Sequence, residues 1–257
     1  MTSFWRSLRC LWRIISVFIQ VLRGVHLVLF LLKNPPETRT PAEWRSINAW
    51  SKGACKRLGL RVHVSGTPAT DSAMFLSNHI SWLDIPVLQS LVSASFVSKA
   101  EVRQWPIIGW VAYHGGTLFV KRGKHDSFTE LREALATRLI HKQGILLFPE
   151  GTTTNGDQVA PFKTRLLQPA ADFGLVVQAV ALQYRSSALP QKKLAFIGND
   201  TFAKHAFRVF SVPIIDVYVH FGQVQQLDPQ WDKRALAQYT RQWVADAHAV
   251  LQANITN

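Results

Sequence analysis

The sequence predicts a single α/β domain with a largely central β-sheet flanked by helices, preceded by a pair of N-terminal helices. Two observations indicate this fold class. Residues 1–58 are apolar and basic, whereas residues 59–257 alternate short apolar runs with helical stretches, as α/β domains do. The chain of 257 residues is also long enough to bury one sizeable core. We therefore expect a boundary between an anchoring segment, 1–58, and a folded domain, 59–257.

The first predicted helix, 4–32, is almost continuously apolar. Its interruptions are Arg6, Arg9, Arg13, Arg23 and His26. The part 14–32 has 19 residues, about the length that spans the hydrocarbon of a bilayer. Arg23 lies in its middle, where an arginine costs about 2.5–3.5 kcal/mol on insertion scales. A spanning helix and a helix in one leaflet, with its arginines reaching the headgroups, are therefore alternatives, and both are membrane anchors.

The second predicted helix, 41–58, follows an Asn-Pro-Pro break and is amphipathic. One side carries Trp44, Ile47, Trp50, Ala54 and Leu58. Residues 1–60 hold ten Lys or Arg and two acidic residues, a net +8 of the chain's +13. Basic charge beside apolar sequence favours an anionic membrane surface, and the absence of a nucleic-acid-binding motif argues against nucleic acid. We expect a membrane-docking helix pair at the inner (cytoplasmic) membrane, with the domain facing the cytoplasm.

The folded domain is predicted from its apolar runs. Seven of them have the length and composition of β-strands: 61–64, 73–77, 94–98, 116–121, 144–148, 176–182 and 214–221. Helical stretches are expected at 127–141, 163–173 and 232–253. The two cysteines, Cys10 and Cys55, follow no disulfide or metal-binding spacing, which favours a reducing compartment.

The first polar motif, Asn-His-x-Ser-x-x-Asp at 78–84, directly follows a predicted buried strand. Five residues are about 500° on a regular helix, so His79 and Asp84 meet only if His79 precedes a helix that contains Asp84. The carboxylate would then accept the Nδ1–H of His79 and leave Nε2 free as a base. Taken alone, this spacing more often marks a helix cap than a catalytic pair.

The second motif, Phe-Pro-Glu-Gly-Thr at 148–152, lies at the end of another predicted strand. Loops that follow the carboxyl ends of strands are where α/β folds place ligands. Glu150 could bind substrate hydroxyls, and the amides of Gly151 and Thr152 could face an anion. An ordinary exit from a strand is equally compatible with this motif alone.

The third motif is basic. The predicted strand 116–121 brings Lys121, Arg122 and Lys124 to its carboxyl end. Arginine can bind a phosphate through two N–H groups at once, so an anionic substrate group is one interpretation. A solvated charge cluster is the other.

Along the chain the His-x4-Asp motif comes first, the basic strand end second and Phe-Pro-Glu-Gly-Thr third. In that order the three motifs resemble the glycerolipid acyltransferase family, in particular 1-acyl-glycerol-3-phosphate acyltransferases, over roughly residues 60–222. The resemblance implies that His79 deprotonates the free hydroxyl of a lysophospholipid acceptor and that Asp84 orients His79. Acyl-CoA or acyl-carrier protein would donate the acyl group as a co-substrate. The thioester supplies the driving force, so the resemblance requires no metal and no redox cofactor.

The resemblance also implies an acceptor site. Its expected residues are Lys121, Arg122, Glu150, Gly151, Thr152 and Lys163. Arg122, with Lys121, would hold the acceptor phosphate, and the Glu-Gly-Thr turn would shape the site.

Three departures from the family pattern leave the acceptor headgroup open. An arginine commonly follows Phe-Pro-Glu-Gly-Thr, and here Thr153 stands in its place; Lys163 or Arg165 could replace it, although many members have glycine at the position of Arg165. The family's fourth block, a buried strand near the acyl donor or acyl chain, is expected at 176–182. It usually carries a proline, whereas this sequence has Gln178-Ala179.

The leading hypothesis is transfer of a fatty acyl group to the 2-position of lysophosphatidic acid, giving phosphatidic acid in phospholipid biosynthesis. Another lysolipid, such as lyso-ornithine lipid, is the alternative acceptor. Two other classes are a thioesterase, in which the same His79–Asp84 pair activates water, and a non-catalytic membrane-binding protein. The second of these does not account for three polar motifs at strand ends.

Overall fold

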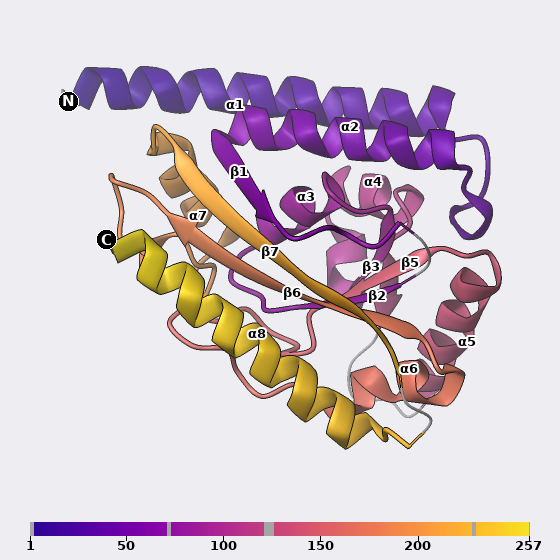
Figure 1. The fold of residues 1–257 in the computed structure, drawn as a ribbon. Helices are drawn as coiled ribbons and strands as arrows, with labels where there is room; N and C mark the ends of the chain where they lie inside the picture. Colours follow the sequence, from indigo (N-terminus) through magenta and orange to yellow (C-terminus); the bar gives the residue numbers. More distant parts are fainter. Residues whose placement is uncertain (1–2, 71–72, 121–125, 228–229, 257) are drawn as a thin grey trace.

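A seven-stranded β-sheet forms the centre of the computed structural model, which describes residues 3–70, 73–120, 126–227 and 230–256 (Figure 1). The strands are β1 (Leu60–Ser65), β2 (Met74–Ser77), β3 (Ala94–Lys99), β4 (Leu118–Val120), β5 (Gly144–Leu147), β6 (Val176–Arg185) and β7 (Ile215–Gln226). Their order across the sheet is β1-β7-β6-β2-β5-β3-β4, and neighbours are parallel except β6 and β7. All seven predicted strands are present, which confirms the predicted fold class.

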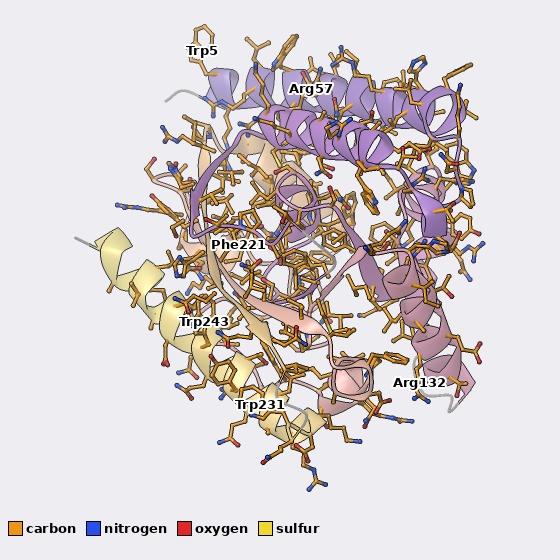
Figure 2. The ribbon with its side chains drawn as sticks, turned by 45° about the vertical axis from the view of Figure 1, so that its right-hand side comes forward. Trp5, Arg57, Arg132, Phe221, Trp231 and Trp243 are labelled. Atoms are coloured by element: carbon orange, nitrogen blue, oxygen red, sulfur yellow. The ribbon has the colours of Figure 1, made fainter. Side chains whose placement is uncertain are left out.

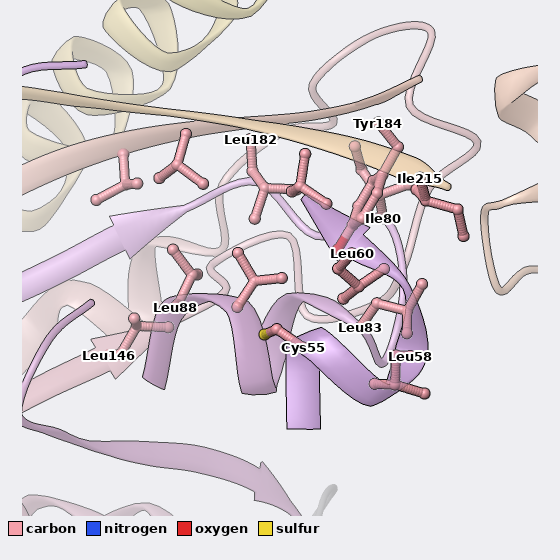
Figure 3. Packing of buried hydrophobic residues seen from close by; sticks show 14 of the residues in the cluster. Cys55, Leu58, Leu60, Ile80, Leu83, Leu88, Leu146, Leu182, Tyr184 and Ile215 are labelled. Carbon is pink, nitrogen blue, oxygen red and sulfur yellow. The ribbon is translucent and has the colours of Figure 1, made fainter. Parts of the chain in front are cut away.

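Helices cover both faces of this sheet (Figure 1). One face is covered by α2 (Pro41–Leu58), α3 (Asp84–Gln89) and α7 (Phe202–Ser211), and the other by α5 (Asp126–Ile140), α6 (Gln168–Phe173) and α8 (Lys233–Thr256). Phe75 of β2 packs into the first core, part of which Figure 3 shows, whereas Met74 and Leu76 pack into the second. This alternation follows from the two-residue period of a strand. Burial on both faces explains why β2 is apolar throughout.

Several helical segments differ from the expectation. The turn η3 (Ala100–Gln104), α4 (Ile108–His114) and α7 are not predicted from the sequence. The first two are too short to give a periodic apolar signal. The predicted helix 163–173 is divided into a 3-10 turn, Thr164–Leu167, and α6, which has Pro169 in its first turn, where a proline is well tolerated.

The N-terminal helices form the expected pair. Helix α1 (Ser3–His26), extended by a π-helical turn at Leu27–Leu31, lies beside α2 (Figure 1). Gln20 and Trp50 join the two helices, because each side chain donates a hydrogen bond to the other residue's carbonyl, at 2.6 and 2.9 Å. The stretch Trp5–Leu31 is long and apolar enough to cross a membrane, and most of it is exposed.

Two arginines of α1, Arg9 and Arg13, turn toward the domain and not toward lipid headgroups as expected, whereas Arg6 and Arg23 are exposed. Arg13 is buried and donates to the carbonyls of Val209, Val212 and Pro213, just beyond and within the last turn of α7. Arg9 donates to the carbonyl of Ser211 at 3.0 Å. The last carbonyls of a helix have no partner within it and carry partial negative charge, so they attract these cations. These hydrogen bonds therefore hold the N-terminal half of α1 against the folded domain.

Candidate active site

The turn after β2 brings His79 and Asp84 together. Asn78 fixes the exit from the strand, because its side chain donates to the carbonyl of Leu182 and accepts from the amide of Leu182, at 2.9 and 2.8 Å. His79 then lies in the turn, and Asp84 is the first residue of α3. The His79 Nδ1 atom is 2.6 Å from Asp84 Oδ2. The spacing argument is therefore confirmed: the two meet because the histidine precedes the helix.

The Asp84 carboxylate is fully buried and surrounded by donors. Besides His79, the amides of Ile80 and Ser81 donate to Oδ2 at 2.7 and 3.0 Å. The hydroxyl of Tyr184 donates to Oδ1 at 2.6 Å. Burial, with the neighbouring carboxylate, raises the pKa of Tyr184 well above its ordinary value, so the phenol keeps its proton and remains a donor. These contacts fix the orientation of the carboxylate.

The His79 ring is supported from the second loop. It stacks on Phe148, with 4.0 Å between ring centroids and 13° between planes. The amide of Thr154 donates to the His79 carbonyl at 2.8 Å. With Nδ1–H donated to Asp84, Nε2 has its lone pair available, and the side chain is 18% exposed. The ring is therefore held in one orientation while it can still meet a substrate.

Glu150 joins the two loops. Its Oε1 accepts the amide N–H of His79 at 2.6 Å, and its Oε2 accepts the amide N–H of Ala160 at 2.7 Å. The residue is 3% exposed. Burial raises the pKa of Glu150 to about 7, and the two N–H donors oppose that rise. Both oxygens accept backbone N–H groups, so Glu150 holds the two loops together; its expected contact with substrate hydroxyls stays a prediction.

The other residues expected after β5 surround this carboxylate. Gly151 has φ +69°, and a Cβ there would lie 2.6 Å from the amine of Lys163, so Lys163 folds over the turn. The Lys163 amide donates to the carbonyl of Pro149 at 2.8 Å. Thr152 and the Lys163 side chain are exposed beside the turn. The structure thus brings Glu150, Gly151, Thr152 and Lys163 together next to His79.

The predicted phosphate ligands Lys121 and Arg122 lie outside the described residues. The strand that precedes them ends at Val120, which pairs with Lys99 of β3. Their role therefore stays a prediction.

Two of the departures from the family pattern have structural explanations. The hydroxyl of Thr153 donates to the carbonyl of Phe196. Gln178 is fully buried at an irregularity in the β6–β7 pairing and bonds the backbone of Ala69, Thr67 and Gly222. These hydrogen bonds therefore hold the connection between β1 and β2 against the sheet. The predicted block 176–182 lies within β6 and is largely buried.

Tyr184 and Asn78 are the site residues that the sequence does not assign. Tyr184 lies two residues beyond the predicted strand 176–182, and Asn78 lies inside the first motif without an expected role. The only available signal is that each is a polar residue at the end of a buried apolar run. Among the described residues, no group of three or more His, Cys, Asp or Glu could hold a metal ion.

A buried carboxylate that orients a partly exposed imidazole, at the carboxyl end of a central strand, is the arrangement that general-base enzymes use. The matches to known proteins specify it further. Residues 60–183 match the family model described as Acyltransferase. A 1-acyl-sn-glycerol-3-phosphate acyltransferase of Neisseria gonorrhoeae is 32% identical over 230 residues, which cover 86% of this chain and 90% of that one. The chain belongs to the glycerolipid acyltransferase family.

Two other relatives bear on the details. A lyso-ornithine lipid O-acyltransferase of Pseudomonas aeruginosa is 41% identical over 170 residues, and this chain spans 66% of its length. The crystal structure of a 1-acyl-sn-glycerophosphate (LPA) acyltransferase from Thermotoga maritima is similar with a TM-score of 0.74 over 98% of each chain. At 21% identity, that similarity concerns the fold alone.

Proposed function

We propose that the protein transfers a fatty acyl group from an acyl thioester, acyl-CoA or acyl-carrier protein, to the free hydroxyl of a lysolipid. The observation that carries this proposal is the 2.6 Å contact between His79 Nδ1 and the buried Asp84. That contact prepares Nε2 to accept a proton, and family membership supplies the reaction class.

The reaction follows from the geometry. Nε2 of His79 takes the proton of the acceptor hydroxyl as its oxygen attacks the thioester carbon. The tetrahedral intermediate collapses, the C–S bond breaks, and the thiolate leaves with the proton from His79. Asp84 stabilises the imidazolium that forms between these two steps. The lysolipid is thus acylated directly, and no acyl-enzyme is required.

Lysophosphatidic acid is the first candidate acceptor. The relatives that align over most of this chain include 1-acyl-sn-glycerol-3-phosphate acyltransferases. In the sequence Lys121 and Arg122 directly follow the last residue of β4, and Lys163 lies beside the Glu150 turn. Three cations are suited to a phosphate monoester.

Lyso-ornithine lipid is the second candidate, and one observation favours it. Thr153 replaces an arginine expected to bind phosphate, and its hydroxyl is bound to the Phe196 carbonyl instead. The loss of one phosphate ligand suits an acceptor without phosphate. The relative with 41% identity is named for this substrate.

The two candidates are separated by Arg122→Ala and Lys163→Ala, assayed on lysophosphatidate and on lyso-ornithine lipid. A phosphate-binding role predicts at least a tenfold rise in KM for lysophosphatidate alone, because a charge-assisted hydrogen bond contributes about 1.5–3 kcal/mol. The exposed Lys192→Ala is the control. Unchanged lysophosphatidate kinetics in both variants would reject the phosphate-clamp assignment.

We also propose that α1 lies in the plane of one leaflet. It contacts α2, α4 and α7, and Arg13 is buried against α7. A spanning orientation would draw these elements toward the bilayer, whereas an in-plane orientation buries the exposed apolar side chains of α1 and leaves the domain in water. Figure 2 shows Trp5 pointing away from the domain, as this orientation requires.

The central test is His79→Ala with a labelled acyl thioester and a panel of lysolipids. We expect loss of transfer to every acceptor, with the thermal unfolding midpoint retained. The exposed His141→Ala is the matched control. A thioesterase would instead release free fatty acid at full rate without acceptor, and wild-type inactivity on all lysolipids would contradict the proposal.

A further inference from the structure

A second exposed apolar surface lies next to the catalytic loop, away from the first helix in sequence. It consists of Trp105, Ile107, Ile108, Trp110 and Phe202, here called the Trp105 patch, and each side chain is 37–51% exposed. Trp105 and Ile107 lie in the turn between η3 and α4, Ile108 and Trp110 lie in the first turn of α4, and Phe202 is the first residue of α7. Exposed aromatic and aliphatic side chains that lie together on one surface can mark a protein–protein or membrane contact.

The turn that presents the patch has a defined conformation. Ile107 has φ 61° and ψ −54°, and the amide of Ile108 donates to the carbonyl of Pro106 at 2.6 Å. This is the γ-turn of positive φ, which is rare and strained, above all for a β-branched residue. Gly109 is packed so closely beneath it that a Cβ would lie 2.3 Å from the Arg103 carbonyl oxygen. The exposed position of Ile107 is therefore imposed by the backbone.

The patch connects the catalytic loop to the anchor helix. Phe202 lies 5.1 Å from the ring of Trp82, inside the His79–Asp84 motif, and 5.2 Å from the ring of Trp105. Helix α1 contacts both α4 and α7, the two helices that carry most of the patch. The apolar helix α1 and the Trp105 patch are therefore connected through the same two helices.

We propose that the Trp105 patch is a second membrane contact, inserted into the same leaflet as α1 beside the catalytic loop. Continuity with α1 identifies the partner as a lipid surface. Tryptophan at the edge of an apolar contact is typical of the membrane interface, and an inserted turn would reach about 5–10 Å into the headgroup–acyl boundary. The exposed Lys99 and Arg103 provide basic charge at its border, with Glu101 the one acid in 99–110. A lysolipid could then pass from the leaflet to His79 without crossing water.

The test needs no enzymatic activity, so its outcome is separate from that of the proposed function. Ile107→Cys is labelled with an environment-sensitive fluorophore in the full chain; Cys10 and Cys55 are buried, so the label goes to position 107. Vesicles of phosphatidylethanolamine and phosphatidylglycerol carry a quencher near the ester carbonyls. We expect a blue shift and quenching of about half the emission at 107.

Two further labels interpret the result. Phe18→Cys reports on α1, and Val250→Cys, an exposed position on α8 across the sheet, is the control that should show no quenching. Quenching at 18 without quenching at 107 overturns the patch and retains the in-plane helix. If neither position is quenched, both the patch and the in-plane orientation of α1 are overturned. Ile108→Cys is the second reporter if labelling at 107 disturbs folding.

A removal variant completes the test. With Trp105 and Trp110 both changed to serine, quenching at 107 should fall by at least about half, because interfacial tryptophans contribute much of the insertion energy. Quenching at 18 should stay unchanged. Equal quenching at 107 with and without the two tryptophans would show that this turn reaches the bilayer passively, and would overturn the patch as a contact.

Discussion

Two buried carboxylates lie in the site, and they differ in what they hold. Asp84 accepts from the imidazole of His79, from a phenol and from two amides of its own loop. Glu150 accepts from two amides in different loops, those of His79 and Ala160. The first carboxylate orients the imidazole of His79, the proposed base, and the second holds the backbone of His79 in its loop. Their substitutions should therefore have effects of different size and kind.

The largest effect is expected for Asp84→Asn. The amide would face donors from Ile80, Ser81 and Tyr184, and His79 would change tautomer so that Nε2 carries the proton. A base without its lone pair cannot act, so kcat should fall by about 10³–10⁴. Steady-state assays with labelled thioester measure it, with the exposed Asp157→Asn of the other loop as control. Retention of a tenth of the wild-type kcat would show that Asp84 does not orient the base.

Glu150→Gln should have an intermediate effect. The amide oxygen can accept one of the two N–H groups, and the NH₂ must face the other, so one loop moves away. We expect kcat to fall about 10–100-fold, since small displacements of positioned groups have effects of that size. Glu150→Ala should be no more active than Glu150→Gln. If Glu150→Gln kept wild-type kcat and changed only KM for the acceptor, Glu150 would contact substrate, as the sequence first suggested.

The same residue predicts a pH dependence of stability. Its pKa is about 7 in the folded chain and near 4.5 in the unfolded chain. Between these values the folded state binds more protons, so the contribution of Glu150 to the free energy of unfolding falls as pH rises, by at most about 3 kcal/mol. Glu150→Gln should remove this slope, and the exposed Glu133→Gln should not. Denaturant unfolding at pH 5, 6 and 7 measures this dependence. If the free energy of unfolding changed equally with pH in the wild type and in Glu150→Gln, the raised pKa of Glu150 would be contradicted.

The two carboxylates also differ in how far the sequence could predict them. The spacing of His79 and Asp84 within one loop gives their contact, because a turn followed by a helix allows one arrangement. Glu150 accepts from the backbone amides of Ala160 and of His79, which lies 71 positions earlier. Every residue except proline has such an amide, so the sequence cannot indicate which amides a distant carboxylate will bind. The central strands β2, β5 and β6 were predictable because burial on both faces makes them apolar runs. Short segments such as α4, whose apolar side chains are exposed, gave no such signal.

The smallest effect, and the sharpest test of the Asp84 environment, is expected for Tyr184→Phe. The change removes one donor from Oδ1 and keeps the ring. Because the amides of Ile80 and Ser81 and the ring of His79 still contact Oδ2, the carboxylate should stay in place, and kcat should fall by less than about tenfold in steady-state assays. Stability should fall by about 1–3 kcal/mol, because a buried oxygen loses its partner.

Tyr218→Phe, on the neighbouring strand β7, is the matched control. A fall in kcat as large as that of Asp84→Asn would mean that the other contacts cannot hold the carboxylate, and an unchanged free energy of unfolding would mean that the Tyr184 hydrogen bond contributes little to stability.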